Sequence, residues 1–387
     1  WIYVLLLMGL LGLSGCGSPS SASMETSSEV TRTAETTQEE QTKLVKTGSM
    51  ELQYAENFTV DYYEDGYKML TTLPDSKRYL LVPEGQSVPG DLDEDICILQ
   101  EPLQNIYLVA SGVMDMFASV DAVDQIHFSG QKKENWYIQE AQDAMAAGTM
   151  VYAGKYNKPD YELLVSEGCD LAIENRMITH SPEVVEMLQS FEIPVMIEYS
   201  SYEQHPLGKV EWVKFFGALT GKESEAEDAF AEQTEILERV SSGEKTGKTI
   251  AFFYVTSNGL IQVRQSTDYI PKLIGLAGGR YIFDDLENSG SGRSTLNMQF
   301  EDFYAGAKDA DILIYNSSID GGVTTVDELI GKCNILKDFK AVQEGQVYCT
   351  TNDMYQQSMA IGYLLQDMHT VLTDDDTAKL RYLFPLQ

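Results

Sequence analysis

Residues 159–222 read PDYELLVSEGCDLAIENRMITHSPEVVEMLQSFEIPVMIEYSSYEQHPLGKVEWVKFFGALTGK, and this stretch decides the fold. It holds two short apolar runs, DLAI at 170–173 and PVMIEY at 194–199, which have the length of buried strands. Between them, apolar side chains recur at i, i+3, i+4 and i+7, the spacing of one helix face: Val184, Met187, Leu188 and Phe191. A strand, a helix and a strand in this order predict a right-handed βαβ unit of a parallel sheet.

The segment that follows predicts a connection to a second lobe. SSYEQHPLGKVEWVKFFGALTGKE, residues 200–223, is helical in pattern and does not return at once to a strand, as a single doubly wound domain would. We expect a helical connector over 206–243, broken near Gly221, with Ser224 and Glu227 as a capping box for its second half. The apolar run TIAFFYV, residues 249–255, then begins the second lobe.

Both flanks of the connector alternate between strand and helix patterns. At 387 residues the chain also exceeds what one hydrophobic core usually encloses. We therefore predict an α/β fold of two lobes, 49–205 and 244–387, each a mainly parallel sheet with flanking helices. The other expected elements are strands at 58–63, 67–72, 78–83, 106–111, 312–316 and 346–350, an Asp65-Gly66 hairpin turn, and helices at 113–119, 270–276, 300–308 and 355–372.

The first residues are typical of an export signal. The uncharged apolar run from Trp1 to Leu13 is too short to span a bilayer but suits a signal-peptide core. It ends in Leu13-Ser14-Gly15-Cys16, which resembles the lipobox of bacterial lipoproteins, so we predict residues 1–16 as signal and lipobox with Cys16 lipidated. An ordinary signal followed by a free cysteine is the alternative. Because no Met and no basic segment precede Trp1, we expect the natural start to lie upstream.

Residues 17–48 and the overall charge limit the partners. Residues 17–48 are rich in Ser, Thr, Glu and Gln and predict a disordered tether to the membrane. With 60 acidic and 27 basic residues the net charge is −33, which argues against nucleic acid as a partner. The remaining cysteines show no metal-binding spacing, and Cys333 and Cys349 are either idle thiols or a pair.

No spacing in the chain indicates catalysis, and we predict no enzyme, catalytic residue or resident cofactor. A G-x-S-x-G elbow and an H-E-x-x-H pair are both absent from the sequence. GEKTGKT, residues 243–249, has one residue too few for a phosphate loop and joins a helix to a strand. We predict no metal site; His180 and His205, which both follow first-lobe strands, remain the alternative, as direct zinc or manganese ligands.

From about Met50 to its end the chain resembles the substrate-binding proteins of ABC importers that capture iron-siderophores, haem and cobalamin. The resemblance is tightest over YAGKYNKPDYELLVSEGCDLAI, residues 152–173, and over residues 200–223. It implies two lobes joined by a helix. It also implies that acidic residues at helix starts meet arginines of a permease dimer: Glu162 in the first lobe, and Glu301 with Asp302 in the second, at a looser spacing.

Ligand is expected between the lobes, at loops that follow the strands. The candidates in the first lobe are Ser111, Met114, Tyr152, Lys155, Arg176, Met177, Ser201 and Tyr202, and those in the second are Ser257, Arg293 and Asn316. Arg176 and Arg293 suit an anionic chelate, because guanidinium binds paired oxygens. Tyr152, Tyr202 and Met177 would suit a flat macrocycle.

The resemblance and these residues together predict a monomeric receptor, lipid-anchored on the outer face of the cytoplasmic membrane. It would bind a metal chelate, with an iron(III)-siderophore as first choice, and deliver it to an ABC permease and its ATPase. Cobalamin or haem is the alternative ligand. A sensory or interaction module on the same fold, without a permease, is the alternative from another functional class.

Overall fold

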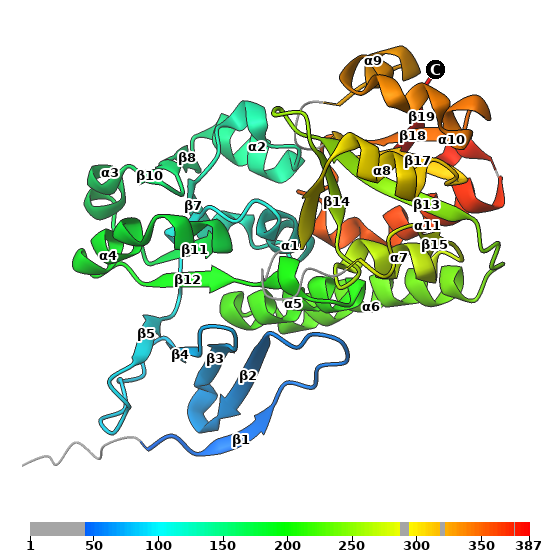
Figure 1. Cartoon of the computed structure of the whole chain (residues 1–387). Helices are drawn as coiled ribbons and strands as arrows, with labels where there is room; N and C mark the ends of the chain where they lie inside the picture. Colours follow the sequence, from blue (N-terminus) through cyan, green and yellow to red (C-terminus); the bar gives the residue numbers. More distant parts are fainter. Residues whose placement is uncertain (1–42, 287–293, 318–321, 375) are drawn as a thin grey trace, which may run out of the picture. The chain divides into compact units, whose positions relative to one another are not determined.

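The computed structural model describes residues 43–286, 294–317, 322–374 and 376–387. The predicted signal, Cys16, most of the predicted tether and Arg293 lie outside these residues. Residues Gln41–Gln387 form one compact unit. Within it, three larger sheets follow one another along the chain, and helices contact each of them (Figure 1).

The first sheet is a mainly antiparallel layer that precedes the predicted βαβ unit. Its strands, in spatial order, are β1 Lys46–Ser49, β2 Phe58–Tyr63, β3 Lys68–Thr72, β4 Lys77–Val82 and β5 Ile96–Gln100. The predicted hairpin turn is confirmed: Asp65 and Gly66 both have positive φ, 57° and 85°, the region that favours such residues. Strand β1 includes the last three residues of the stretch predicted as tether, 46–48.

The second sheet confirms the parallel βαβ unit. Residues Ala172 to Asn175 of β11 pair in parallel with Val195 to Glu198 of β12, across helix α4. The sheet order is β12-β11-β6-β7-β8. The bounds are β6 Ile106–Leu108, α1 Val113–Ser119, β7 Ile126–Ser129, α2 Gln139–Ala147, β8 Val151–Tyr152, α3 Tyr161–Ser166, β11 Leu171–Asn175, α4 Pro182–Ser190 and β12 Val195–Glu198; a small hairpin, β9 Gly154–Lys155 with β10 Lys158–Pro159, lies beside it.

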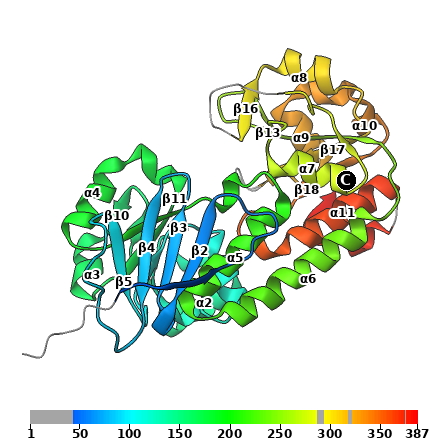
Figure 2. The ribbon, with the colours of Figure 1, turned by 90° about the horizontal axis from the view of Figure 1, so that it is seen from below.

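The connector is a helical hairpin rather than one rod. Helix α5, Pro206–Thr220, ends at Gly221 with φ 72°, a left-handed cap that only glycine adopts without strain. Helix α6, Glu223–Ser241, then runs back beside α5 (Figure 2). The predicted capping box is wrong: α6 begins without a side-chain cap, and Glu227 instead pairs with Lys214 of α5 at 2.9 Å.

Two buried carboxylates attach the first sheet to this connector. Glu211 of α5 is fully buried and accepts hydrogen bonds from the backbone N–H groups of Gln53, Tyr54 and Ala55, at 2.8–2.9 Å. Glu203, just before α5, accepts those of residues 56 and 57, both at 3.0 Å. The segment between β1 and β2 is therefore held by charged groups of the connector.

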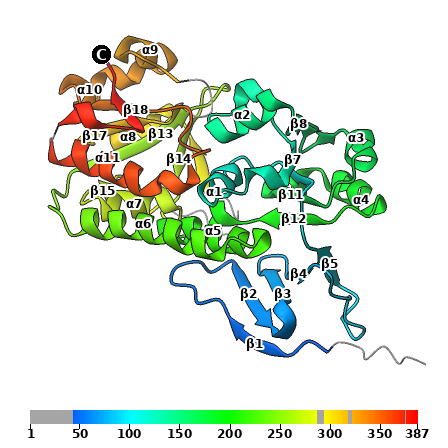
Figure 3. The same cartoon turned by 180° about the vertical axis from the view of Figure 1, so that it is seen from behind.

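The third sheet is mixed. Strand β13 pairs in parallel with β15 and β17, and β17 with β18, whereas β14, β16 and β19 pair antiparallel. Helix α11 begins six residues later than predicted and lies beside α6 (Figure 3). The bounds are β13 Thr249–Val255, β14 Ile261–Arg264, α7 Tyr269–Leu276, β15 Arg280–Tyr281, β16 Thr295–Met298, α8 Phe300–Ala307, β17 Ile312–Tyr315, α9 Val326–Lys332, α10 Lys340–Gln343, β18 Val347–Thr350, α11 Ile361–Thr373 and β19 Leu383–Pro385.

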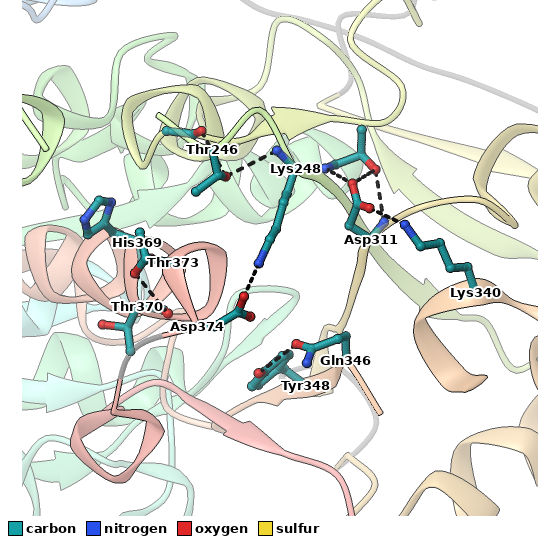
Figure 4. A network of polar contacts seen from close by, with 12 residues as sticks. Thr246, Lys248, Asp311, Lys340, Gln346, Tyr348, His369, Thr370, Thr373 and Asp374 are labelled. Atoms are coloured by element: carbon teal, nitrogen blue, oxygen red, sulfur yellow. Dashed lines mark hydrogen bonds and ion pairs between the residues drawn. The ribbon is translucent and has the colours of Figure 1, made fainter. Parts of the chain in front are cut away.

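A polar network fixes the starts of β13 and β17 to each other (Figure 4). Asp311 accepts from the N–H and hydroxyl groups of Thr249 at 2.7 and 2.8 Å, and it pairs with Lys340 at 2.6 Å. Burial acts to raise the pKa of Asp311, but these donors outweigh it and hold the pKa below its ordinary value. Lys248 pairs with Asp374 nearby at 2.5 Å.

Candidate functional site

A cavity of 280 Å³ collects loops from both parallel-stranded sheets and one face of the connector. The lining residues from the first half of the chain, before the connector, follow β6, β11 and β12. They lie at the carboxyl edge of the second sheet, where α/β folds bind ligands. Lys209 of α5 and residues next to β14, α7 and β16 complete the cavity. The lining comprises Ala110, Ser111, Gly112, Asn175, Arg176, Met177, Glu198, Ser201, Tyr202, Lys209, Arg264, Asp268, Tyr269, Ser294 and Tyr355.

Two further cavities adjoin this first one at Ser111. One, of 660 Å³, shares Ser111 and Asn175 with it and extends over the ends of β7 and β8 to Tyr152 and Lys155. The other, of 210 Å³, shares Ser111 and Tyr355 and reaches Gln356 of the second half. The three cavities together have room for a ligand with a bulky part and a narrow arm.

Arg264 and Asp268 form a buried ion pair on the second-half side of the first cavity. Their atoms Nη1 and Oδ2 lie 3.3 Å apart, and Arg264 also donates to the hydroxyl of Tyr355. Asp268 caps α7 by accepting from the N–H of Ile270 at 2.9 Å. Burial raises the pKa of Asp268, against the opposing effect of Arg264, and raises that of Tyr355 to about 12. The pair fixes the loop between β14 and α7.

Glu198 and Lys209 face the cavity from β12 and α5. Glu198 is 7% exposed and accepts from the N–H and hydroxyl of Ser200 at 2.8 and 2.6 Å. Lys209 is 5% exposed, and its Nζ lies 4.9 Å from the centre of the Tyr269 ring. Burial raises the pKa of Glu198 and lowers that of Lys209. Both charged groups therefore lie in a site of low polarity.

The structure brings together most of the first-lobe residues predicted as ligand contacts. Ser111, Arg176, Met177, Ser201 and Tyr202 line the first cavity, and Ser111, Tyr152 and Lys155 line the second. The Arg176 guanidinium lies over the Tyr202 ring, 4.5 Å from its centre. Met177 and Tyr202 are 51% and 41% exposed, so apolar surface remains open at the mouth. Their contact with a ligand stays a prediction.

The other predicted ligand contacts lie elsewhere. Met114 of α1 is fully buried in the hydrophobic core. Ser257 lies in the exposed turn between β13 and β14. Asn316 is 3% exposed and lies behind Tyr355, to whose hydroxyl it donates at 2.7 Å. None of these three lines any of the three cavities.

The predicted docking residues lie at exposed helix starts. Glu162 is in the first turn of α3, and Glu301 and Asp302 are in the first turn of α8. All three side chains are exposed, and the helix dipole favours carboxylates at these positions. A contact with a permease remains a prediction.

His180 and His205 do not form a metal site together. His180 is exposed, whereas His205 stacks on Tyr54 at 4.4 Å and accepts from the N–H of Leu207 at the start of α5. Within the described ranges, no group of three or more His, Cys, Asp or Glu side chains could hold a metal ion. In the same ranges, no helix has the length and apolarity needed to cross a bilayer.

The four cysteines outside the signal region form no disulfide bond with one another. The alternative of a bridge between Cys333 and Cys349 is therefore not formed, and both side chains are buried. Cys97 and Cys169 are half-buried.

Four charged residues and two tyrosines of the first cavity were not predicted from the sequence. They are Glu198, Lys209, Arg264, Asp268, Tyr269 and Tyr355. One signal was available: Glu198 ends the strand 194–199, so the strand-end rule that selected Ser201 applies to it as well. Nothing in the local pattern distinguishes Lys209 from a solvated helix residue.

The comparisons with known proteins agree with this arrangement. A family model described as periplasmic binding protein matches residues 106–354. An uncharacterized lipoprotein of Methanocaldococcus jannaschii is 23% identical, over 96% of this chain and 92% of its own length. The crystal structure of a periplasmic haem-binding protein of Vibrio cholerae superposes with a TM-score of 0.55 at 15% identity, over 69% of this chain and 98% of that one. An ABC-type Fe3+-hydroxamate transport protein of Saccharomonospora viridis gives 0.54 at 16% identity, over 70% and 93%.

Proposed function

Because the chain belongs to the periplasmic binding protein family, we propose that it is the substrate-binding component of an ABC importer. It captures a metal chelate outside the cytoplasm and delivers it to a permease that an ATPase drives. The observation that carries this proposal is the cavity lined by loops of two sheets and by the connector. In this reading the protein binds its ligand and performs no chemistry on it.

An iron(III)-siderophore is the ligand that we favour. Arg176 at the mouth of the first cavity and Lys155 in the second supply cations for anionic oxygens of a chelate. The likeness to a protein of a ferric hydroxamate transport system supports the same class. Haem is the second candidate, because Met177 and Tyr202 expose apolar surface that suits a flat ring. Cobalamin has only the resemblance to the family in its favour.

The proposed place of action is the outer face of the cytoplasmic membrane. Cys16 would carry the lipid, and the stretch up to the first strand would tether the protein within reach of its permease. The likeness to a lipoprotein over almost the whole chain supports this location. Lipidation is tested by labelling cells with a radioactive fatty acid, with Cys16→Ser as the variant that loses the label.

Ligand capture is tested by titrating the protein with ferric desferrioxamine B, a ferric catecholate and haem while following tryptophan fluorescence. Trp136 is buried next to Asn135 of the second cavity, so a bound chelate should quench it. Arg176→Gln should weaken an anionic chelate about tenfold, the size expected for a charged hydrogen bond. Arg239→Gln, on the exposed last turn of α6, is the matched control. No binding of any chelate would exclude this ligand class.

Delivery to a permease is tested separately by charge reversal. Glu162→Lys combined with Glu301→Lys should leave chelate affinity unchanged and reduce uptake by cells at least about tenfold, because the paired contacts would become repulsive. Glu183→Lys combined with Glu235→Lys, at exposed positions of α4 and α6, is the control with the same change of charge. Normal uptake by the double variant would remove the docking role. Normal ligand binding without any uptake in the wild type would favour a sensory module.

A further inference from the structure

Lys209 is a buried cation that has no paired anion among the described residues. It is 5% exposed, lies in the first turn of α5 and lines the first cavity. Its Nζ makes no hydrogen bond and no ion pair within the described part of the chain, and its close polar contact is the face of the Tyr269 ring at 4.9 Å. Buried lysines are normally paired, because an ammonium loses its hydration when it leaves water. Lys209 therefore has unused donors toward the cavity.

The nearby carboxylates have other partners. Glu198 accepts from the N–H and hydroxyl of Ser200. Asp268 pairs with Arg264 and caps α7 through the N–H of Ile270. Neither carboxylate approaches Lys209 within ion-pair distance, so the ammonium is available to a ligand.

The first cavity is positive in a strongly acidic protein. Its lining holds three cations, Lys209, Arg264 and Arg176, and two carboxylates, Glu198 and Asp268, which leaves one net positive charge when all are ionised. The whole chain carries −33. A local excess of the opposite sign, in a concave site of low polarity, attracts an anion more strongly than the same charges at the surface.

We propose that the connector contributes a subsite for an anionic oxygen group of the ligand, a carboxylate or a group of similar charge, bound by the Lys209 ammonium. The Tyr269 hydroxyl, which has no hydrogen bond within the described ranges, is the neutral donor beside it. Ligand seated here touches the connector and both halves at once, because Glu198 and Arg264 flank Lys209 from β12 and β14. The binding of an anionic group by Lys209 does not depend on the proposed function. Only the identity of the rest of the ligand, a metal chelate, rests on it.

The sizes of the two cavities fit a ligand with a short anionic arm and a bulkier chelating part. The 280 Å³ around Lys209 holds a short anionic arm, whereas the adjoining 660 Å³ cavity holds the bulk of a chelate. A ligand whose free end is a carboxylate should therefore bind better than one with the same chelating core and a cationic end.

The test uses two ferric hydroxamates with one chelating core. Ferric desferrioxamine B ends in an ammonium group, and its N-succinyl derivative ends in a carboxylate. We expect the full-length protein to bind the succinyl derivative about tenfold more tightly. Lys209→Met should remove this preference, and Lys209→Arg should keep it, since arginine also binds carboxylates. Lys272→Met, an exposed lysine on α7, is the matched control and should keep it.

If Lys209→Met still bound the succinyl derivative more tightly than ferric desferrioxamine B, the proposed subsite would be wrong. If neither ferric hydroxamate binds the wild type, this ligand class fails, and the subsite is decided by thermal unfolding in sodium succinate against sodium chloride of equal ionic strength. An increase of the midpoint in succinate that Lys209→Met loses and Lys272→Met keeps supports the subsite without the chelate. No increase in the wild type overturns it. Methionine fills the space of the buried lysine stem, so the variant should remain folded.

Discussion

Glu174 is an isolated titratable residue among those described. It lies on β11, is fully buried, and neither of its carboxylate oxygens has a hydrogen-bond partner. Its side chain lies on the sheet face of Tyr107 and Phe128, which is otherwise apolar. Burial raises the pKa of Glu174 to about 8. At neutral pH the side chain therefore carries a proton and behaves as a neutral polar group.

Glu174→Gln should stabilise the protein at high pH. The folded-state pKa is raised above the value of about 4.5 in the unfolded chain, so stability is fully present below pH 4.5 and is lost as the pH rises toward 8. The ionisation of Glu174 can lower the free energy of unfolding by at most about 5 kcal/mol, since each pKa unit corresponds to about 1.4 kcal/mol. We expect Glu174→Gln to gain about 1–3 kcal/mol over the wild type at pH 9 and much less at pH 5.

Urea unfolding of both proteins at the two pH values measures this difference. Glu186→Gln, on the exposed face of α4, is the control and should show no dependence of this kind. A gain of equal size at both pH values would mean that Glu174 titrates normally in the folded protein.

Single residues could be predicted from the sequence only where topology alone places them. Ser111, Arg176 and Ser201 follow strands of a predicted parallel sheet, and the strand-end rule brings such loops to one edge. Lys209 follows no strand. Its role depends on the burial of nearly every face of α5 by several neighbours, among them α6, α1, β2 and α7. Such burial arises from long-range packing, which a local pattern of polar and apolar residues does not record.

At the scale of elements, α5 acts as an anchor for the first sheet. Glu211 accepts three backbone N–H groups, from Gln53, Tyr54 and Ala55, and lies 3.6 Å from Lys214. A neutral amide at this position would offer one carbonyl oxygen to these donors and present an NH₂ group to the rest. The charge on Glu211 thus holds the entry of β2 against the connector.

Glu211→Gln should loosen this attachment while the sheets stay folded. We expect a loss of about 2–4 kcal/mol in the free energy of unfolding, because buried donors lose a charged acceptor. Hydrogen exchange should accelerate at the amides of residues 53–55 and remain unchanged in β18. Glu235→Gln, exposed on α6, is the matched control. Unchanged exchange at residues 53–55 would show that apolar packing, and not Glu211, holds the segment.

Elements with a long apolar run were predicted well, and short or polar ones were not. The run TIAFFYV matches β13 residue for residue, because a strand with buried neighbours on both sides is apolar throughout. Strand β16, TLNM, has half-exposed polar positions and forms only because β14 pairs with it. Helix α11 begins at Ile361 rather than Tyr355, because residues 355–360 form turns that place Tyr355 and Gln356 at the cavities.

At the scale of the whole molecule, the two-lobed α/β prediction is confirmed by the family match and by the solved relatives. Of the separate sheet β1 to β5, only β2, β3 and β4 were predicted as strands, and the attachment of the sheet depends on Glu203 and Glu211, far away in the sequence. This sheet lies before residue 106, where the family match begins. The residues that line the three cavities lie within the match, except Tyr355 and Gln356, which directly follow it.

Gln356 joins the two halves directly, and this contact yields the last prediction. Its Oε1 accepts from the N–H of Tyr137, and its Nε2 donates to the carbonyl of Asn135, both at 2.8 Å. Gln356→Ala removes both bonds, so the amide of Tyr137 should exchange faster and the free energy of unfolding should fall by about 1–2 kcal/mol. Gln357→Ala is the control, since the side chain of Gln357 bonds to Asp353 and Tyr382 of its own half. If both alanine variants had an equal effect, Gln356 would not link the halves. A ligand bound where the three cavities meet at Ser111 would contact both halves, so chelate binding should slow hydrogen exchange at the amide of Tyr137 in the wild type.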